Sequence, residues 1–191
     1  MWQPMELPYE SLPGLSKKLL EAHYGLYLRY LDRWDELHHR LQDAPPGDPF
    51  EYGRLLAEEG MLRNAVRLHE LYFENLTPGG AGDPFDVVGD DEMYVRWEDR
   101  FHKAALASTG WVIRAMDLAT GRLFDFTMSS HAHGFVALAV PLLVIDCYEH
   151  SYMSDYGIDK GAYLDAVLVN VDWNIVTERA RVPDPLMKAL V

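Results

Sequence analysis

Residues 141–156, PLLVIDCYEHSYMSDY, contain the most informative pattern in this chain. The first five residues are apolar and uncharged, which predicts a buried β-strand. The apolar run ends at Asp146, and His150 follows one turn of chain later. The two side chains could therefore face a common centre. Carboxylate oxygen and imidazole nitrogen are donors that suit a first-row transition metal.

The carboxylate at the end of this run also has a simpler interpretation. An aspartate between a strand and a helix is often only the N-terminal cap of the helix. A nearby histidine is often a hydrogen-bonded residue of the core or the surface. Glu149 adds a further carboxylate, and buried carboxylates are costly unless they are paired or bind a metal. The stretch alone leaves a structural role and a metal site open, so further ligands must come from elsewhere.

Several other short motifs lie in a fixed order along the chain. They are LPY at 7–9, EAHYG at 21–25, HELYFENL at 69–76 with PGG at 78–80, GW at 110–111 and VDW at 171–173. Together with residues 141–156, this order resembles the iron/manganese superoxide dismutase family. Each motif alone carries little weight. Their order and separations carry the resemblance, which extends over most of the chain.

The composition limits the size and class of the protein. The chain has 191 residues, of which 49% are hydrophobic, enough for the core of one compact unit or two small lobes. It has no run of about 18 apolar residues, so no membrane span is expected. A formal net charge of -13 argues against a nucleic-acid partner, because such a partner requires a basic face.

Cysteine content and the first residues bear on the cellular compartment. Cys147 is the single cysteine, which excludes an internal disulfide and fits a reducing environment. The amino-terminal residues include Glu6, Glu10 and prolines rather than a basic and then apolar signal. We therefore expect a cytoplasmic protein.

The first half of the chain predicts two long helices. Residues 17–41 have apolar side chains at helical spacing, and His23 lies on that apolar face. The proline-rich segment at 45–49 ends this helix, and a second one is predicted over 50–76 with His69 on its apolar face. A short loop between two helices indicates an antiparallel hairpin. His23 and His69 could then meet across it.

The second half predicts a mixed lobe. The glycine- and proline-rich segment at 77–84 is the clearest linker, so we expect a helical hairpin domain at 1–83 and a second domain at 84–191. Half-buried or buried strands are predicted at 111–118, 122–128 and 137–145, and helices at 93–108, 162–169 and 173–180. The fold class is therefore α+β, with a small three-stranded antiparallel sheet packed by helices.

The family resemblance implies the metal site. It assigns four ligands, which are His23, His69, Asp146 and His150. One iron or manganese ion per chain is implied, and ligands of this kind do not decide between the two metals. Three imidazoles and one carboxylate leave room for solvent as a fifth ligand. The implied reaction is the disproportionation of superoxide to dioxygen and hydrogen peroxide.

The same resemblance assigns roles around the metal. Trp111 corresponds to an aromatic wall of the pocket. His131 corresponds to the residue that hydrogen-bonds the metal-bound solvent, although a plain loop histidine is the alternative. Ala65 stands where iron-type members carry a glutamine, and its small side chain leaves room for a partner from residues 129–134. Such donors tune the redox potential of a metal.

The residues that guard the family's substrate funnel are changed. A histidine and a tyrosine follow the first ligand in the family, and here those positions hold Tyr27 and Leu31. Tyr27 is the candidate catalytic residue of the two. Tyr30 lies one residue away from the guarding position and is expected to face elsewhere. Other departures from the family's aromatic residues are Phe73, Tyr148 and Met153.

These features predict a superoxide dismutase, with a second hypothesis beside it. The altered funnel would also suit an oxidase or oxygenase that acts on a small organic substrate on the same fold. A third hypothesis is a metal-binding homologue without turnover. The resemblance also implies a homodimer, in which Glu149 reaches across the interface toward the partner's ligand histidine.

Overall fold

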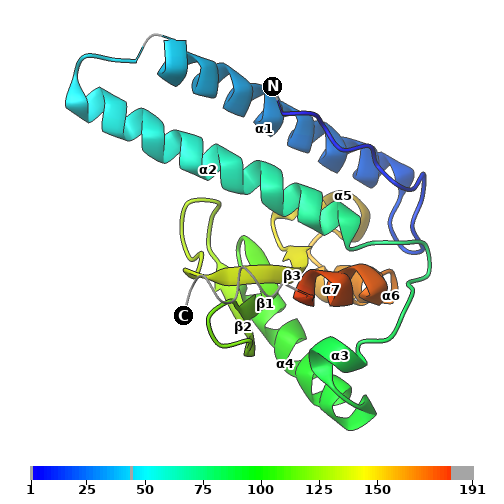
Figure 1. The fold of residues 1–191 in the computed structure, drawn as a ribbon. Coiled ribbons are helices and arrows are strands. Elements are labelled where there is room, and N and C mark those ends of the chain that lie inside the picture. The colour runs from blue at the N-terminus through cyan, green and yellow to red at the C-terminus, as the bar shows by residue number, and fades with distance from the viewer. Residues whose placement is uncertain (1, 44, 182–191) are drawn as a thin grey trace.

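Two long helices form an antiparallel hairpin at the start of the protein. The computed structural model describes residues 2–43 and 45–181. The helices are α1 (Lys17–Asp43) and α2 (Pro49–Glu74), which lie side by side (Figure 1). Asp48 caps α2 by accepting a hydrogen bond of 2.7 Å from the backbone N–H of Phe50, and proline at the first helical position suits this start.

A three-stranded sheet follows the hairpin. Its strands are β1 (Trp111–Asp117), β2 (Leu123–Met128) and β3 (Ala139–Asp146). The order is β2-β1-β3, and both pairs are antiparallel. The expected α+β class with a three-stranded antiparallel sheet is therefore confirmed. The register pairs Trp111 with Asp146, so the ends of β1 and β3 lie together.

The burial of the central strand differs from the sequence expectation. Half-buried alternation was expected over 111–118, but every residue from Trp111 to Met116 in β1 is buried. The expectation is wrong because β1 has a paired strand on each edge and helices packed against the sheet. Arg114 shows the effect, since its guanidinium is buried and donates hydrogen bonds to the Val87 carbonyl and the Asp125 carboxylate.

Six further helical segments among the described residues complete the fold. The one-turn helix α3 was not expected from the sequence, and the segment after Asp146 forms a 3-10 turn and one turn of α-helix. The elements are α3 (Phe85–Val88), α4 (Asp91–Ala107), η1 (Glu149–Ser151), α5 (Met153–Tyr156), α6 (Lys160–Val169) and α7 (Trp173–Ala180). The helices α2 and α7 pack against β3, and α4 packs against β1 and β2.

The hydrophobic core joins the hairpin to the sheet. One large cluster contains buried residues of both helices of the hairpin and of all three strands. The free end of the hairpin projects beyond the sheet (Figure 1), and Leu37, Leu41, Leu55 and Leu62 form a second, smaller cluster there. Since the large core continues from the hairpin into the sheet, the division at residues 83 and 84 stays a prediction.

A buried polar contact fixes β3 against α2. The side chain of Asn75, at the end of α2, donates to the Val144 carbonyl at 2.5 Å. Arg179 of α7 donates to the Asn75 side chain and, at 2.8 Å, to the Leu142 carbonyl. Because β3 ends at Asp146 and α2 carries His69, this contact sets the position of both residues.

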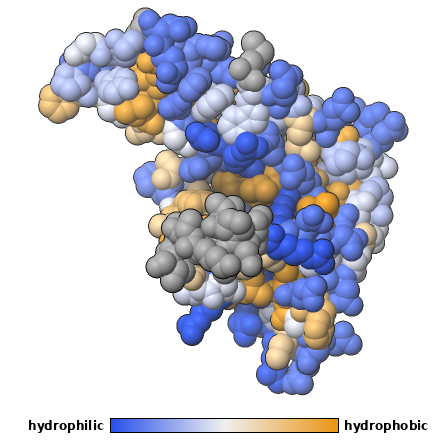
Figure 2. Space-filling view, in the orientation of Figure 1, coloured by the Kyte–Doolittle hydropathy of each residue, from blue (hydrophilic) through white to orange (hydrophobic). Residues whose placement is uncertain are grey.

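The outer surface of the hairpin is mostly hydrophilic, and some hydrophobic side chains are exposed near its free end (Figure 2). Among the residues that the structure describes, no helix has the length and apolar character needed to cross a membrane.

Candidate metal centre

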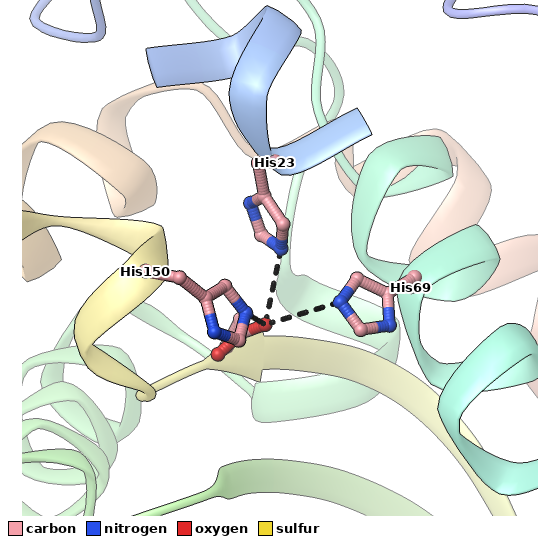
Figure 3. Close-up of side chains that lie close together, drawn as sticks. His23, His69 and His150 are labelled. Carbon is pink, nitrogen blue, oxygen red and sulfur yellow. Dashed lines mark hydrogen bonds and ion pairs between the residues drawn. The ribbon is translucent and has the colours of Figure 1, made fainter. Parts of the chain in front are cut away.

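Four side chains from separate elements meet at one buried point. They are His23 of α1, His69 of α2, Asp146 at the end of β3 and His150 of η1 (Figure 3). One possible ligand atom from each lies within 4.8 Å of the others. Three of these residues are buried, and the side chain of His150 keeps 30% of its exposure. The four residues predicted from the sequence as ligands are thus brought together.

The three imidazoles surround a single carboxylate oxygen. Oδ2 of Asp146 lies 3.1 Å from Nε2 of His23, 3.0 Å from Nε2 of His150 and 3.7 Å from Nε2 of His69. The other oxygen, Oδ1, accepts the backbone N–H of Tyr148 at 2.8 Å. That bond orients the carboxylate so that Oδ2 faces the histidines.

The hydrogen bonds of His69 determine which of its nitrogens is free. Nδ1 lies 2.6 Å from the carbonyl oxygen of Ala65, which can only accept, so Nδ1 carries the proton. In the neutral ring Nε2 is then a lone-pair donor, and it is buried without a hydrogen-bond partner. Buried polar atoms are rarely left unsatisfied. A free imidazole nitrogen directed at two other histidines and a carboxylate fits a bound metal ion.

The electrostatics keep these groups in the form that binds metals. Burial is the main cause that lowers the pKa of His69 to about 3, and the nearby His23 lowers it further. Burial also lowers the pKa of His23. Burial would raise the pKa of Asp146, but hydrogen bonds with His150 and His23 outweigh it and lower that pKa. At neutral pH His23 and His69 are neutral and Asp146 is ionised, as metal ligation requires.

Comparison with known proteins identifies the family. Residues 90–179 match the model of the C-terminal domain of iron/manganese superoxide dismutases. The chain is 33% identical to the superoxide dismutase [Fe] of Aquifex pyrophilus, covering 89% of this chain and 86% of that protein. The chain belongs to the iron/manganese superoxide dismutase family. The resemblance inferred from the sequence motifs is confirmed.

Relatives within this family carry either metal in their names. The superoxide dismutase [Fe] of Cupriavidus metallidurans is 33% identical, over 93% of this chain and 94% of its own length. The superoxide dismutase [Mn] 1 of Halobacterium salinarum is 28% identical, over 92% of each chain. Nitrogen and oxygen donors together suit both metals. Within residues 2–43 and 45–181 there is one such cluster, which fits one ion per chain.

Trp111 and His131 form a layer next to the cluster. The indole N–H of Trp111 donates to Nδ1 of His131 at 3.0 Å, and the Trp111 ring lies 5.1 Å from the ring of His69. Burial lowers the pKa of His131 to about 4. An indole N–H can only donate, so Nδ1 of the neutral His131 is an acceptor and Nε2 carries the proton. His131 is therefore available as a hydrogen-bond donor.

Asn64 positions the loop that carries His131 and was not found by sequence reasoning. Its side-chain N–H donates to the backbone carbonyl of His131 at 2.8 Å. Ala65 beside it is fully buried, and its carbonyl accepts from His69. The only signal in the sequence was the place of Asn64 next to Ala65, about one helical turn before His69.

The structure places Tyr27 away from the cluster. Its hydroxyl donates to Oε1 of the buried Glu70 at 3.0 Å and accepts the backbone N–H of Met5 at 3.0 Å. This position, which the resemblance assigned to the substrate funnel, instead joins α1, α2 and the amino-terminal segment.

Tyr30 lies beside the cluster instead. Its ring centre is 5.5 Å from that of His69 and 5.2 Å from that of His131. The expectation that Tyr30 faces elsewhere is wrong. Two turns of an α-helix contain 7.2 residues, so Tyr30, seven positions after His23, lies on nearly the same side of α1.

The remaining departures pack around the histidines. The ring of Phe73 is 5.1 Å from that of His23, and the ring of Tyr148 stacks on His150 at 5.3 Å. The fully buried ring of Tyr72 also contacts His23, at 5.0 Å. Met153 is half exposed. Aromatic side chains thus exclude water from most sides of the cluster.

Removal of one of the four side chains should abolish metal binding. We expect His69→Ala and Asp146→Ala to contain less than about one tenth of the wild-type metal, because each loses a donor from a four-donor set. Elemental analysis of purified protein measures this. His133→Ala is the matched control, since His133 is an exposed histidine on the His131 loop and should keep full metal. Full metal in both cluster variants would contradict the assignment.

The metal-free protein should lose stability as the pH falls below the pKa of an unperturbed histidine side chain. His69 and His131 titrate near 3 and near 4 in the folded state, against 6.5 for an unperturbed histidine. The unfolded chain therefore takes up these protons first, so stability is complete above pH 6.5 and declines as the pH falls toward 4. The urea concentration at which half of the metal-free protein is unfolded should therefore decrease as the pH is lowered from about 7 to about 5.

A variant at one of the two histidines supplies the control for this dependence. His131→Gln removes one titrating group, so its urea midpoint should fall less over the same pH interval. An equal fall in the two proteins would show that His131 does not contribute.

Proposed function

We propose that His23, His69, Asp146 and His150 bind one iron or manganese ion and that the protein disproportionates superoxide. The single observation that carries the proposal is the convergence of three imidazole nitrogens on one oxygen of a buried carboxylate. Family membership supports it, because the relatives are named superoxide dismutases. This function is favoured over an oxidase or oxygenase, which only the changed funnel residues suggest.

The reaction converts two superoxide anions and two protons to dioxygen and hydrogen peroxide. One superoxide loses an electron and the other gains one. When bound, the metal supplies this one-electron chemistry by alternating between its divalent and trivalent states. Four protein ligands leave space for solvent or a small anion. The protein itself must hold the ligands, keep out other molecules and supply the protons.

His131 is the residue best placed to supply a hydrogen bond at the centre. Its Nε2 carries a proton because Trp111 donates to Nδ1. Asn64 holds the His131 backbone from the other side. The proposed role of Trp111 is therefore to fix the tautomer of His131 and to wall the pocket. Tyr27 has no direct part in this proposal, since Glu70 and Met5 occupy its hydroxyl.

Metal-loaded protein should disproportionate superoxide, and His131→Ala should lower kcat about a hundredfold, because a positioned proton donor contributes at least about that much. A superoxide assay on protein of measured iron and manganese content tests both statements. His133→Ala, with an exposed histidine of the same loop, should keep wild-type activity. Full metal without superoxide turnover would contradict the proposed function and favour the oxidase, oxygenase or non-catalytic alternatives.

A homodimer is the proposed assembly. His150 is the one side chain of the cluster that remains partly exposed, and Glu149 beside it is exposed. A carboxylate from a second copy could therefore reach His150 from outside, as the family resemblance implies for Glu149. Such a contact would cover the open side of the centre and orient the imidazole.

Removal of that carboxylate should weaken the dimer. We expect Glu149→Ala to shift wild-type dimer toward monomer at micromolar concentration, as measured by light scattering on a sizing column. Glu178→Ala removes another exposed carboxylate and should leave the dimer intact. A monomeric wild-type protein would contradict this assembly.

A cytoplasmic location is also proposed. It is supported by the single, buried cysteine, which fits a reducing compartment. Fractionation of the source cells tests this location. Detection of the protein in a periplasmic or secreted fraction would contradict it.

A further inference from the structure

Three arginines line one small cavity on the sheet side of the molecule. Arg96 and Arg100 lie on α4, Arg114 lies on β1, and apolar side chains complete the walls. The cavity has a volume of about 210 Å³. The helix α4 lies at the end of the molecule away from the hairpin (Figure 1), and the cavity shares no residue with the metal cluster. It is therefore a separate feature of the protein.

Arg114 is the buried member of this group. Its side chain keeps only 9% of its exposure. Nε donates to the Val87 carbonyl at 2.7 Å, and Nη1 donates to the Asp125 carboxylate at 2.9 Å. A guanidinium has further N–H donors on Nη2, and the described residues provide no acceptor for them. Because Arg114 lines the cavity, an acceptor bound there would satisfy these donors.

Arg96 and Arg100 are exposed, and they lie four residues apart on the same side of α4. Arg96 pairs with Glu92, but 68% and 75% of the two side chains are exposed. Such an exposed pair contributes little, so Arg96 can exchange this carboxylate for another anion. Arg100 has no acidic partner among the described residues.

The charges around the cavity favour an anion. The carboxylates paired with the three arginines are Glu92 and Asp125, so positive charge is in excess there. The chain as a whole has a formal net charge of -13, which repels anions from most of its surface. The cavity is thus a local exception to the charge of the protein.

We propose that this cavity binds a small oxyanion of the phosphate type, either inorganic phosphate or the phosphate group of a small monoester. Guanidinium groups match phosphate oxygens with paired hydrogen bonds. Pockets for drug-sized ligands measure about 300 to 1,000 Å³, so a cavity of about 210 Å³ suits a single phosphate group rather than a larger molecule. The proposal uses no residue of the metal cluster and does not depend on the proposed function.

Calorimetric titration of metal-loaded protein with inorganic phosphate, at constant ionic strength, tests the proposal. We expect saturable binding of one phosphate per chain. Arg100→Gln should weaken it about tenfold, the effect of losing a hydrogen bond between charged groups. Arg100→Lys should give an intermediate affinity, because lysine keeps the charge but lacks the planar fork. Both variants should fold, since Arg100 is exposed.

Arg33→Gln is the matched control. Arg33 is an exposed arginine of α1 that pairs with Glu58 at 3.1 Å, and its replacement changes the net charge by the same amount. This variant should keep the wild-type phosphate affinity. Equal losses of affinity in Arg33→Gln and Arg100→Gln would show a general charge effect and overturn the proposal.

The melting temperature gives a second measurement. Phosphate should raise it in the wild type and in Arg33→Gln, and should raise it less in Arg100→Gln, because a ligand stabilises only the folded protein that binds it. The same titration with glycerol phosphate distinguishes the two sources of the anion, since the tighter of the two ligands identifies the one preferred. Failure of the wild type to bind either ligand would overturn the proposal.

The optical spectrum of the metal separates this cavity from the metal centre. It should stay unchanged at the phosphate concentrations that saturate the calorimetric signal. A spectral change that follows the same binding curve would place the anion at the metal and overturn the proposal. Superoxide turnover does not enter this test, so a failure of the proposed function leaves its outcome readable.

Discussion

The structure depends on the charge of Asp146. Its carboxylate is fully buried, and an unpaired ion in such a place costs several kcal/mol. Three histidines and the backbone N–H of Tyr148 surround it, and each histidine comes from a different element. The long hairpin, the third strand and the turn after it are thus held together at the point where a metal ion fits. The four side chains therefore meet only where the hairpin packs against the sheet.

A second layer of contacts transmits the order of the sheet to the centre. Trp111 is the strand neighbour of Asp146, so the register of β1 and β3 places its indole beside His69. The indole N–H then fixes the tautomer of His131, and Asn64 of α2 holds the same residue by its backbone. Hydrogen bonding around the site is therefore set by strand pairing and by the hairpin together.

A second buried carboxylate, Glu70, lies next to the cluster on α2. Glu70 binds the phenol of Tyr27, and Arg67 balances the charge of Glu70. These contacts give Tyr27, four residues after His23, a structural role. Tyr30, three residues later on α1, lies beside His69 and His131.

The sequence by itself determined the long helices, the three strands and the types of residue at the centre. Helical spacing and prolines located α1 and α2 within about three residues, the β-branched run located β3, and the ordered motifs singled out the four cluster residues. The tertiary structure decided which tyrosine lies beside the centre, how Asn64 and Trp111 hold His131, and that β1 is buried from Trp111 to Met116. Helical spacing allows both Tyr27 and Tyr30 on the side of His23, and the difference between them depends on partners from other parts of the chain: Glu70 and Met5 bind Tyr27, whereas Tyr30 packs on His69.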